Sequence, residues 1–417
     1  MLLLCLLLLS SAAAKPNLFH SILLNDPDPL GARCLDGTPP RIWLHLAEPG
    51  SPNATKWAWH FQGGGWCESE ESCTQRAFGR TTCMLGSSRE ECFNDNGCNV
   101  EAFQPVMDVL DLPAVNGARW GGGLLNNSAA TNPVSHDWNK VLMMYCDGGS
   151  YSGNNATAVP VVFNGTERVI HYRGFRNLNF ALEVLAKEHG MAEATDVLIS
   201  GDSAGGLASY WHADRFAAAL PKAFVATVPD SGFFIGDATK PAWPAALKWI
   251  ASAMNSTAGL DASCVAAATA SGETPGEACT LPEDVAPHIE VPLFTMNSKF
   301  DPAMISISSM AKSASDINAL ASRFVAKVNS AVLSPAQKKN GAWITGCEEH
   351  CGQWSQGQMA GSNSDFNTTI DGTTAPFAVA AWYAANRKHA QSGPSEFVHM
   401  ATAKYPCENC CAGGDGP

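Results

Sequence analysis

Short apolar runs recur along the chain and alternate with longer segments in which apolar residues return at helical spacing. Several runs are apolar at almost every position, which is typical of strands buried on both faces of a parallel sheet. The predicted strands cover residues 42–46, 57–61, 141–145, 196–200, 225–228 and 291–296. The predicted helices cover residues 175–187, 207–220 and 317–328. This alternation predicts one doubly wound α/β domain with a mostly parallel sheet.

Two long segments depart from this alternation. Residues 67–132 are rich in Cys, Gly and Asn and show little periodicity. We therefore expect a disulfide-pinned excursion, a long irregular loop that lies beside the functional site. Residues 232–287 follow a predicted strand and are rich in Ala, Trp and Pro, which suggests a lid rather than a separate domain. The large apolar residues of this lid, which either line a cavity or pack a helix onto the core, are Trp243, Trp249, Ile250 and Met254.

The composition is that of a folded protein. Of the 417 residues, 46% are hydrophobic and 16% are charged, which allows a large core and argues against disorder. The net charge of -13 would repel nucleic acid over most of the surface. We therefore exclude a nucleic-acid-binding function.

The chain begins with MLLLCLLLLSSAAA, an apolar run followed by small residues. This pattern predicts a secretory signal peptide over residues 1–14 and a mature chain over residues 15–417. The apolar run is far too short to cross a bilayer, and no later stretch is long and apolar enough. The protein is therefore predicted to be secreted, without a stable membrane span.

Cysteine usage agrees with export. The chain has 15 cysteines, and removal of the leader with Cys5 leaves 14, an even number that favours a disulfide-bonded protein. A zinc site at Cys407, Cys410 and Cys411 is the alternative, but no histidine stands at ligand spacing. We expect neither a metal nor a cofactor. Sequons for N-glycosylation, which support the same compartment, occur at Asn53, Asn126, Asn155, Asn164, Asn255 and Asn367.

Residues 197–206, VLISGDSAGG, join an apolar strand to a helix-compatible segment through the pattern G-x-S-x-G. In this context the pattern predicts a nucleophile elbow that exposes Ser203 on a strained turn. A Cβ at Gly201 or Gly205 would clash there, because the two backbones pack closely. The alternative is a glycine-rich turn with a structural serine, but the flanking strand and helix favour a nucleophile.

A nucleophilic serine needs N–H donors for the developing oxyanion. One donor is expected from Ala204, the residue after the nucleophile. The sequence FQGGGWC at residues 61–67 follows a predicted strand and supplies a glycine-rich loop for the second donor. The alternatives are a simple turn or a phosphate-binding loop, and the absence of a following Lys-Ser/Thr disfavours the latter.

The chain order expected for such an elbow is Ser, then the acid, then His, so the acid should follow a late strand. Asp301 lies just after the predicted strand at residues 291–296 and is the favoured acid. Asp230 lies just after the predicted strand at residues 225–228 and is the competitor. Its alternative role is to hold loop backbone near the site.

Three histidines follow Asp301, and one of them must be the base if Ser203 is a nucleophile. His350 lies in the sequence CEEHC, where a disulfide-held loop would fix its imidazole. His389 lies in a basic, helix-like segment that we expect to be solvated. His399 has the setting of a surface or core histidine.

Short motifs follow one another in a fixed order along the chain: GGGWC (63–67), WNKV (138–141), YCDG (145–148), SG (152–153), YRG (172–174), GDSAGG (201–206), PDSGFF (229–234), NSKFD (297–301), CEEHC (347–351) and YPC (405–407). This ordered set resembles the pectin acetylesterase and Notum family of extracellular carboxylesterases, from about Cys34 to Cys411. The resemblance implies an α/β-hydrolase fold and a serine esterase. The site residues that it implies are the triad Ser203, Asp301 and His350 and the backbone oxyanion donors Gly64, Gly65 and Ala204. The disulfides that it implies are Cys34–Cys146, Cys67–Cys73 and Cys264–Cys279.

The leading hypothesis for function is hydrolysis of acetyl esters on a cell-wall or matrix polysaccharide such as pectin. The first alternative is a Notum-like deacylase that removes a fatty acyl group from a secreted protein. The second is a catalytically inactive secreted binding protein on the same fold. An acidic protein that acts on pectin would need a local basic patch, for which Arg119, Arg173 and Arg176 are candidates.

Overall fold

The computed structural model describes residues 18–79, 85–88, 106–108, 114–115, 118–119, 123–236, 242–308, 313–352, 368–388 and 394–407. The predicted leader, His389 and the sequon at Asn367 lie outside the described residues, as does much of the excursion at residues 67–132.

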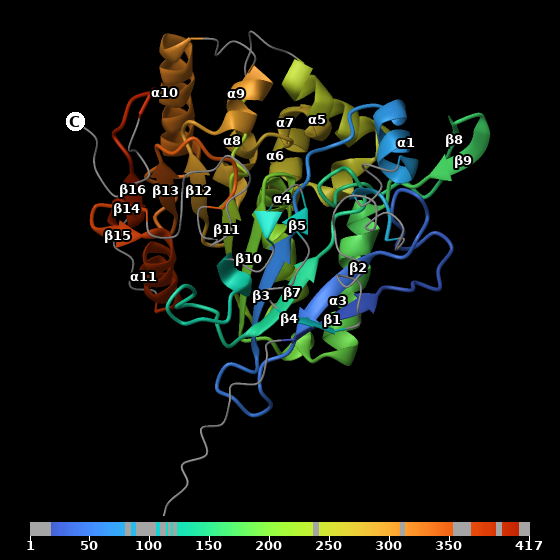
Figure 1. The fold of residues 1–417 in the computed structure, drawn as a ribbon, viewed down its shortest axis with the longest axis horizontal. Helices are drawn as coiled ribbons and strands as arrows, with labels where there is room; N and C mark the ends of the chain where they lie inside the picture. The colour runs from blue at the N-terminus through green and yellow to red at the C-terminus, as the bar shows by residue number, and fades with distance from the viewer. Residues whose placement is uncertain are drawn as a thin grey trace, which may run out of the picture.

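A ten-stranded sheet runs through the molecule (Figure 1). Its strands, in spatial order, are β16 (Val398–Met400), β13 (Gly341–Thr345), β12 (Phe294–Ser298), β11 (Phe224–Asp230), β10 (Asp196–Asp202), β3 (Lys56–Phe61), β7 (Asn139–Met143), β2 (Arg41–His45), β1 (Leu18–Leu23) and β4 (Val106–Asp108). The pairs from β16 to β7 are parallel, and those from β7 to β4 are antiparallel. Three small hairpins lie outside it: β5–β6 (Ala114–Val115, Ala118–Arg119), β8–β9 (Val159–Phe163, Thr166–Ile170) and β14–β15 (Thr369–Ile370, Thr373–Thr374).

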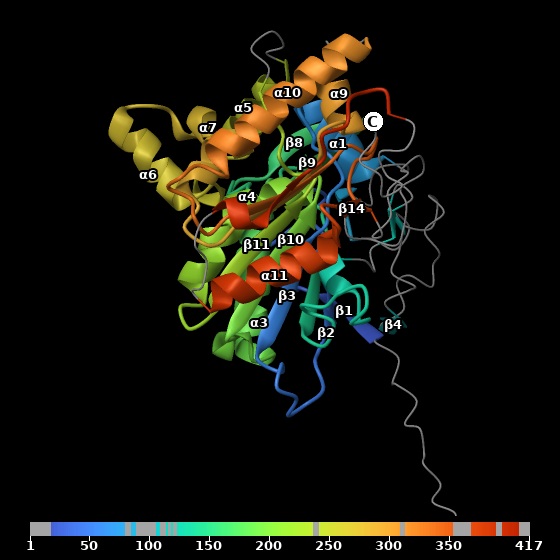
Figure 2. The same cartoon turned by 90° about the vertical axis from the view of Figure 1, so that its left-hand side faces the viewer.

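Helices cover both faces of the sheet and its upper end in Figure 1. The α-helices are α1 (Glu70–Phe78), α3 (Gly174–Glu188), α4 (Ala204–Ala219), α5 (Ala242–Ala253), α6 (Ala262–Ser271), α7 (Pro275–Ala278), α8 (Pro282–Val285), α9 (Pro302–Ser308), α10 (Ala314–Ala331) and α11 (Ala375–Arg387). Short 3-10 turns are η4 (Gly123–Leu125), η5 (Met191–Glu193), η6 (Ser256–Gly259), η7 (Ala286–His288) and η8 (Pro394–Phe397). Helices α5 to α7 gather at one end of the molecule (Figure 2), so the predicted lid is a helical insertion.

Alternate residues of the central strands face two separate cores. Val197 and Ile199 of β10 belong to the larger core together with Leu207 of α4. Leu198, between them, belongs to a second core together with Trp382 of α11. The strands are therefore buried on both faces, as their continuous apolar runs predict.

The structure confirms the predicted doubly wound α/β architecture. All six predicted strands and all three predicted helices are present, with ends shifted by a few residues. The strands β13 and β16 and the helix α11 were not predicted. Within the described residues, no helix is long and apolar enough to cross a membrane.

All three disulfides implied by the resemblance are present: Cys34–Cys146, Cys67–Cys73 and Cys264–Cys279. The first joins segments that are 112 residues apart in the chain. A crosslink that closes so long a loop removes much conformational entropy from the unfolded chain. Cys407 is also disulfide-bonded, which argues against the zinc alternative.

Candidate active site

Ser203 lies between the end of β10 and the start of α4, in the strained conformation expected for a nucleophile elbow. Its φ of 55° and ψ of -119° fall in a region that residues with a Cβ rarely adopt. The backbone N–H of Ser203 donates a hydrogen bond to the carbonyl oxygen of Asp230 at 3.0 Å, and this bond fixes the turn against the end of β11. Strain of this kind in a serine directly before a helix raises the hydroxyl above the sheet edge.

The two glycines that flank Ser203 are required by close packing. A Cβ added at Gly201 would lie 2.2 Å from the carbonyl oxygen of Gly205. A Cβ added at Gly205 would lie 2.1 Å from the carbonyl oxygen of Phe61 in β3. Both clashes are with backbone, so a side chain at either position would displace the elbow.

The structure brings together the three residues that the sequence analysis favours. The Nε2 atom of His350 lies 2.8 Å from Oγ of Ser203. The Nδ1 atom of the same ring lies 2.8 Å and 2.9 Å from the two carboxylate oxygens of Asp301. Asp301 is completely buried, and its carboxylate also accepts a hydrogen bond from the backbone N–H of Ala303. In this chain of hydrogen bonds, His350 can take the proton of Ser203 while Asp301 orients the imidazole.

Asp230 has the backbone-holding role that was considered as its alternative. One carboxylate oxygen accepts a hydrogen bond from the N–H of Gly352 at 3.0 Å, and the other accepts one from the hydroxyl of Ser231. The Ser231 hydroxyl in turn accepts a hydrogen bond from the N–H of Cys351 at 2.8 Å. Asp230 and Ser231 therefore fix the loop that carries His350.

The other histidines do not compete within the described residues. His399 lies on β16, where its ring is 5.6 Å from that of Trp343, and its Nδ1 atom is 3.7 Å from a carboxylate oxygen of Asp371. Burial lowers the pKa of His399. This is the environment of a partly buried histidine packed on an edge strand, far from any role in the hydrogen-bonded chain at Ser203.

Only one of the two cysteines around His350 is disulfide-bonded. Cys347 is bonded, whereas Cys351 is a free, buried thiol. Burial raises the pKa of the Cys351 thiol well above its ordinary value, so the group is a poor nucleophile. The Asp230–Ser231 hydrogen bonds, rather than a second disulfide, hold the C-terminal side of the loop.

The glycine-rich loop after β3 lies against Ser203. We call residues 63–66 the oxyanion loop. Gly64 and Gly65 have φ values of 140° and 65°, which only glycine adopts readily. Both line the same hollow as Ser203 and His350, and Ala204 provides the first N–H of α4. These backbone groups are the candidate donors to an oxyanion.

Asp202 joins the elbow to the oxyanion loop, and the sequence analysis missed it. One carboxylate oxygen of Asp202 accepts hydrogen bonds from His60 at 3.0 Å and from the N–H of Gly63 at 3.2 Å. The other ring nitrogen of His60 lies 2.8 Å from the hydroxyl of Ser200. Asp202 occupies the variable position of the G-x-S-x-G pattern, so the motif itself gives no reason to select it.

The hollow above Ser203 has a volume of about 450 Å³. One wall is aromatic: the ring of Trp66 lies 4.8 Å from that of Trp243 and 5.1 Å from that of Phe234. The ring of Phe234 also lies 6.2 Å from the imidazole of His350. These three rings form one wall of the hollow beside the nucleophile.

Most of the predicted lid residues pack on the core. Ile250 and Met254 are buried in the larger core. The ring of Trp249 lies 6.3 Å from that of Tyr172. Only Trp243 lines the hollow above Ser203. Of these four residues, therefore, Trp243 is the one placed at the hollow above Ser203.

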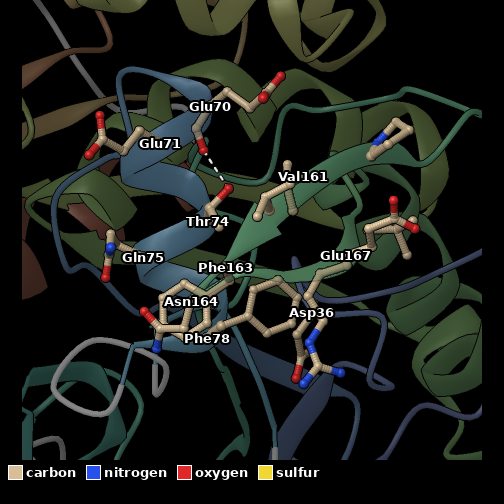
Figure 3. Close-up of a pocket in the computed structure, with 14 residues that line it drawn as sticks. Asp36, Glu70, Glu71, Thr74, Gln75, Phe78, Val161, Phe163, Asn164 and Glu167 are labelled. Atoms are coloured by element: carbon tan, nitrogen blue, oxygen red, sulfur yellow. Dashed lines mark hydrogen bonds between the residues drawn. The ribbon is translucent and has the colours of Figure 1, made fainter.

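A second, larger hollow lies on the far side of α1. It has a volume of about 1070 Å³ and lies between α1 and the hairpin β8–β9 (Figure 3). Its polar lining includes Glu70, Glu71 and Glu167, and its floor includes Phe78 and Phe163, whose rings are 5.8 Å apart. This hollow, which we call the α1 groove, contains none of the predicted catalytic residues. Among the described residues, no cluster of His, Cys, Asp or Glu has the arrangement of a metal site.

Opposing effects set the pKa of His350. Burial lowers it, but the nearby carboxylates of Asp301, Asp202 and Asp230 raise it by more, so the pKa lies above its ordinary value. An imidazole that acts as a base must be unprotonated. A raised pKa therefore moves the loss of activity on acidification to a higher pH.

We predict that kcat/KM for a neutral ester falls with decreasing pH through an apparent pKa above about 6.5, the ordinary value of histidine. Removal of one nearby charge in Asp202→Asn should move this acid limb to lower pH. The measurement is a profile of kcat/KM for a nitrophenyl ester from pH 4 to pH 9. An acid limb below the ordinary value in the unmodified protein would contradict the prediction.

Three features define the α/β-hydrolase class in this protein. The sheet is mostly parallel, a strained serine lies between a strand and a helix, and a histidine that is bonded to an aspartate contacts that serine. The family model described as pectinacetylesterase matches residues 12–98 and 115–412. The chain therefore belongs to the pectinacetylesterase family, and it is a carboxylic ester hydrolase.

Individual relatives agree with this assignment. Pectin acetylesterase 11 of Arabidopsis thaliana is 28% identical over 375 residues, which are 85% of this chain and 84% of the relative. Pectin acetylesterase 5 of the same plant is 32% identical over 276 residues, covering 65% of this chain and 55% of the relative. The palmitoleoyl-protein carboxylesterase NOTUM of Homo sapiens is 24% identical over 207 residues, covering 48% of this chain and 34% of the relative.

Proposed function

We propose that this protein removes acetyl groups from a polysaccharide outside the cell, with Ser203 as nucleophile, His350 as base and Asp301 as orienting acid. The observation that carries the proposal is the continuous hydrogen-bonded chain from Ser203 through His350 to Asp301. The strained elbow and the adjacent oxyanion loop support it.

The first half of the reaction makes an acetyl-enzyme. His350 accepts the proton of Ser203 as Oγ attacks the ester carbonyl. The backbone N–H groups of Gly64, Gly65 and Ala204 receive the tetrahedral oxyanion. When the intermediate collapses, the alcohol leaves with the proton from His350. Water, activated by His350, then releases acetate and restores the Ser203 hydroxyl.

The aromatic wall favours a short acyl group. Trp66, Phe234 and Trp243 are in mutual contact beside His350, with ring centroids of Phe234 and Trp243 5.5 Å apart. An acetyl group needs little space next to Ser203, whereas a fatty acyl chain that extended past these rings would have to displace them. The Notum-like alternative is therefore less well supported.

We predict that kcat/KM is highest for acetyl esters and falls steeply for acyl chains longer than about four carbons, because each extra methylene must displace packed atoms. Trp243→Ala should raise kcat/KM for hexanoate relative to acetate by roughly tenfold, since it opens the aromatic wall. The measurement is hydrolysis of nitrophenyl esters from acetate to palmitate.

Trp249→Ala is the matched control for this series. Trp249 packs on Tyr172 and does not line the hollow above Ser203. Its removal should leave the chain-length preference unchanged. A preference of the unmodified protein for octanoyl or longer esters would favour the fatty-acyl alternative, and no hydrolysis of any ester would favour an inactive binding protein.

The α1 groove supports a large alcohol group on the substrate. Helix α1 lines both hollows, because Arg76 faces the hollow above Ser203 while Glu70 and Glu71 face the α1 groove. Carboxylates and aromatic rings are side chains that suit sugar hydroxyls and sugar faces. The groove is lined by four carboxylates and one cation, Arg168, and this excess of negative charge would repel a free polyuronate. We propose that neutral or esterified sugar units occupy it.

Arg173 does not contribute to an exposed basic patch. Arg173 is only 2% exposed, and its guanidinium donates hydrogen bonds to the backbone carbonyls of Pro29, Gly31 and Ala156. The expectation of a basic patch is therefore wrong for Arg173, whose role is to hold the surrounding loops.

We predict that Glu71→Ala lowers kcat/KM for acetylated, methyl-esterified pectin by about three- to tenfold, since one hydrogen bond to a charged group is lost. Hydrolysis of nitrophenyl acetate should not change, because Glu71 lies outside the hollow above Ser203. Glu188→Ala, at the exposed end of α3, is the control of equal charge. Increased activity of Glu71→Ala on the polymer would show that the groove repels the substrate.

The disulfides support an extracellular location. Three disulfides occur within the described residues, and such bonds persist in oxidising compartments. Together with the predicted leader, they favour secretion, and a polysaccharide substrate favours the cell wall as the site of action.

A further inference from the structure

The oxyanion loop is tied to helix α1 at two points. The disulfide Cys67–Cys73 joins the residue after the loop to the first half of α1, with a Cα–Cα distance of 4.9 Å. One turn further along the helix, Arg76 reaches back to the loop. Its Nη2 atom donates a hydrogen bond to the carbonyl oxygen of Gly64 at 3.0 Å.

Arg76 is a buried cation. Only 9% of the residue is exposed, and its guanidinium lies 5.7 Å from the centre of the Tyr145 ring. Burial lowers the pKa of Arg76, and the fields of Tyr145, Asp147 and Glu68 oppose that lowering. A guanidinium nevertheless stays protonated in proteins. A permanent positive charge therefore lies within hydrogen-bond distance of the oxyanion loop.

The hydrogen bond from Arg76 fixes one particular peptide unit. In a trans peptide the carbonyl oxygen and the following N–H point in opposite directions. When Arg76 holds the carbonyl of Gly64, the N–H of Gly65 in the same unit must point away from α1. Glycines on both sides would otherwise let this unit rotate, because neither has a Cβ to restrict it.

We propose that Arg76 is a positioning residue of the oxyanion hole, which orients and polarises the Gly65 N–H through the Gly64 carbonyl. The inference rests on the proposed function and adds a charged residue outside the triad. Tyr145 assists, because its hydroxyl donates a hydrogen bond to the carbonyl of Gly65 at 2.9 Å. Two successive peptide carbonyls of the loop, those of Gly64 and Gly65, are thereby held by side chains from α1 and from the segment that follows β7.

The charge on Arg76 should matter more in the transition state than in the ground state. A cation at the oxygen end of a peptide strengthens its N–H as a donor, since hydrogen bonds in a chain polarise one another. The ester carbonyl is neutral when the substrate binds and becomes an oxyanion as Ser203 attacks. Loss of the Arg76 charge should therefore lower kcat and leave KM nearly unchanged.

The test compares Arg76→Gln and Arg76→Lys with the unmodified protein. We expect Arg76→Gln to lower kcat for nitrophenyl acetate by about 10- to 100-fold, with KM changed by less than about threefold. Affinity for an alkyl boronic acid, which takes up the Ser203 oxygen as a tetrahedral anion, should fall in parallel. Arg76→Lys keeps the charge without the planar fork, so its kcat should be intermediate.

Arg173→Gln is the matched control, because Arg173 is also a buried arginine that binds backbone carbonyls. It should lower the melting temperature but leave kcat and boronate affinity within about twofold of the unmodified protein. A folded Arg76→Gln protein with unchanged kcat, or with unchanged boronate affinity, would overturn the inference. If Arg76→Gln does not fold, Arg76→Lys decides, and wild-type kcat in that variant overturns it.

Failure of the proposed function would be distinguishable from failure of this inference. Retention of activity by Ser203→Ala would refute the triad, whatever the Arg76 variants do. Retention of activity by Arg76→Gln alongside an inactive Ser203→Ala protein would refute only the role of Arg76.

Discussion

Replacing Ser203 with alanine should reduce ester hydrolysis by several orders of magnitude without unfolding the protein. The loss is expected in kcat, because the attacking oxygen is removed while the pocket that binds the ester is preserved. The alanine methyl group fits where the serine side chain lies, and the elbow is held by backbone contacts to Asp230 and Gly205. The measurement is steady-state hydrolysis of nitrophenyl acetate, with circular dichroism to establish folding.

Ser306→Ala is the control for that experiment. Ser306 also lines the hollow above Ser203 but belongs to α9 and is not a member of the hydrogen-bonded chain from Ser203 through His350 to Asp301. Its variant should keep kcat within a few-fold of the unmodified protein. Near-normal turnover by a folded Ser203→Ala protein would end the assignment of Ser203 as nucleophile.

Replacing Asp301 with asparagine should lower kcat by about 10⁴-fold, the loss seen when a triad acid becomes an amide and the histidine takes the wrong tautomer. Asp301 is fully buried against Nδ1 of His350, so no water can replace its carboxylate. Asp230→Asn should lose much less, because an amide oxygen can still accept one of the hydrogen bonds that fix the His350 loop.

The two variants should be compared in kcat on the same ester and in melting temperature. Both remove one charge near His350, so each should move the acid limb of kcat/KM, but only Asp301→Asn should remove nearly all turnover. If Asp230→Asn proved the more damaging change in a stably folded protein, the roles of the two aspartates would be reversed.

Local sequence was sufficient for the parts of the fold that depend on near neighbours. The central strands and their helices were predicted from apolar runs and helical spacing, because burial on both faces of a parallel sheet leaves that pattern. The elbow at Ser203 was predicted because its glycines are required by close backbone contacts within and beside a single turn. The disulfides followed from the resemblance rather than from spacing, which cannot specify pairings.

Long-range packing decided what the sequence left open. Asp301 and Asp230 both follow apolar strands, so the sequence does not distinguish their roles. Only the sheet order and the path of the His350 loop show that the Asp301 carboxylate binds Nδ1 of His350, whereas the Asp230 carboxylate binds the backbone of the His350 loop. His350 contacts Ser203 although the two residues are 147 positions apart in the chain, so the contact has no local signature. The same holds for Arg76, which no motif marks.

The sequence by itself determined the alternating α/β framework and the position of the nucleophile, because both depend on residues that are neighbours in the chain. What only the tertiary structure decided is which distant side chains converge on that nucleophile. It also decided that, of the four large apolar residues named for the lid, only Trp243 lines the hollow above Ser203, that Arg173 is buried rather than part of a basic surface, and that Cys351 is a free thiol. Each of these depends on the relative placement of elements far apart in the chain, and such placement leaves no periodic trace in the residues themselves.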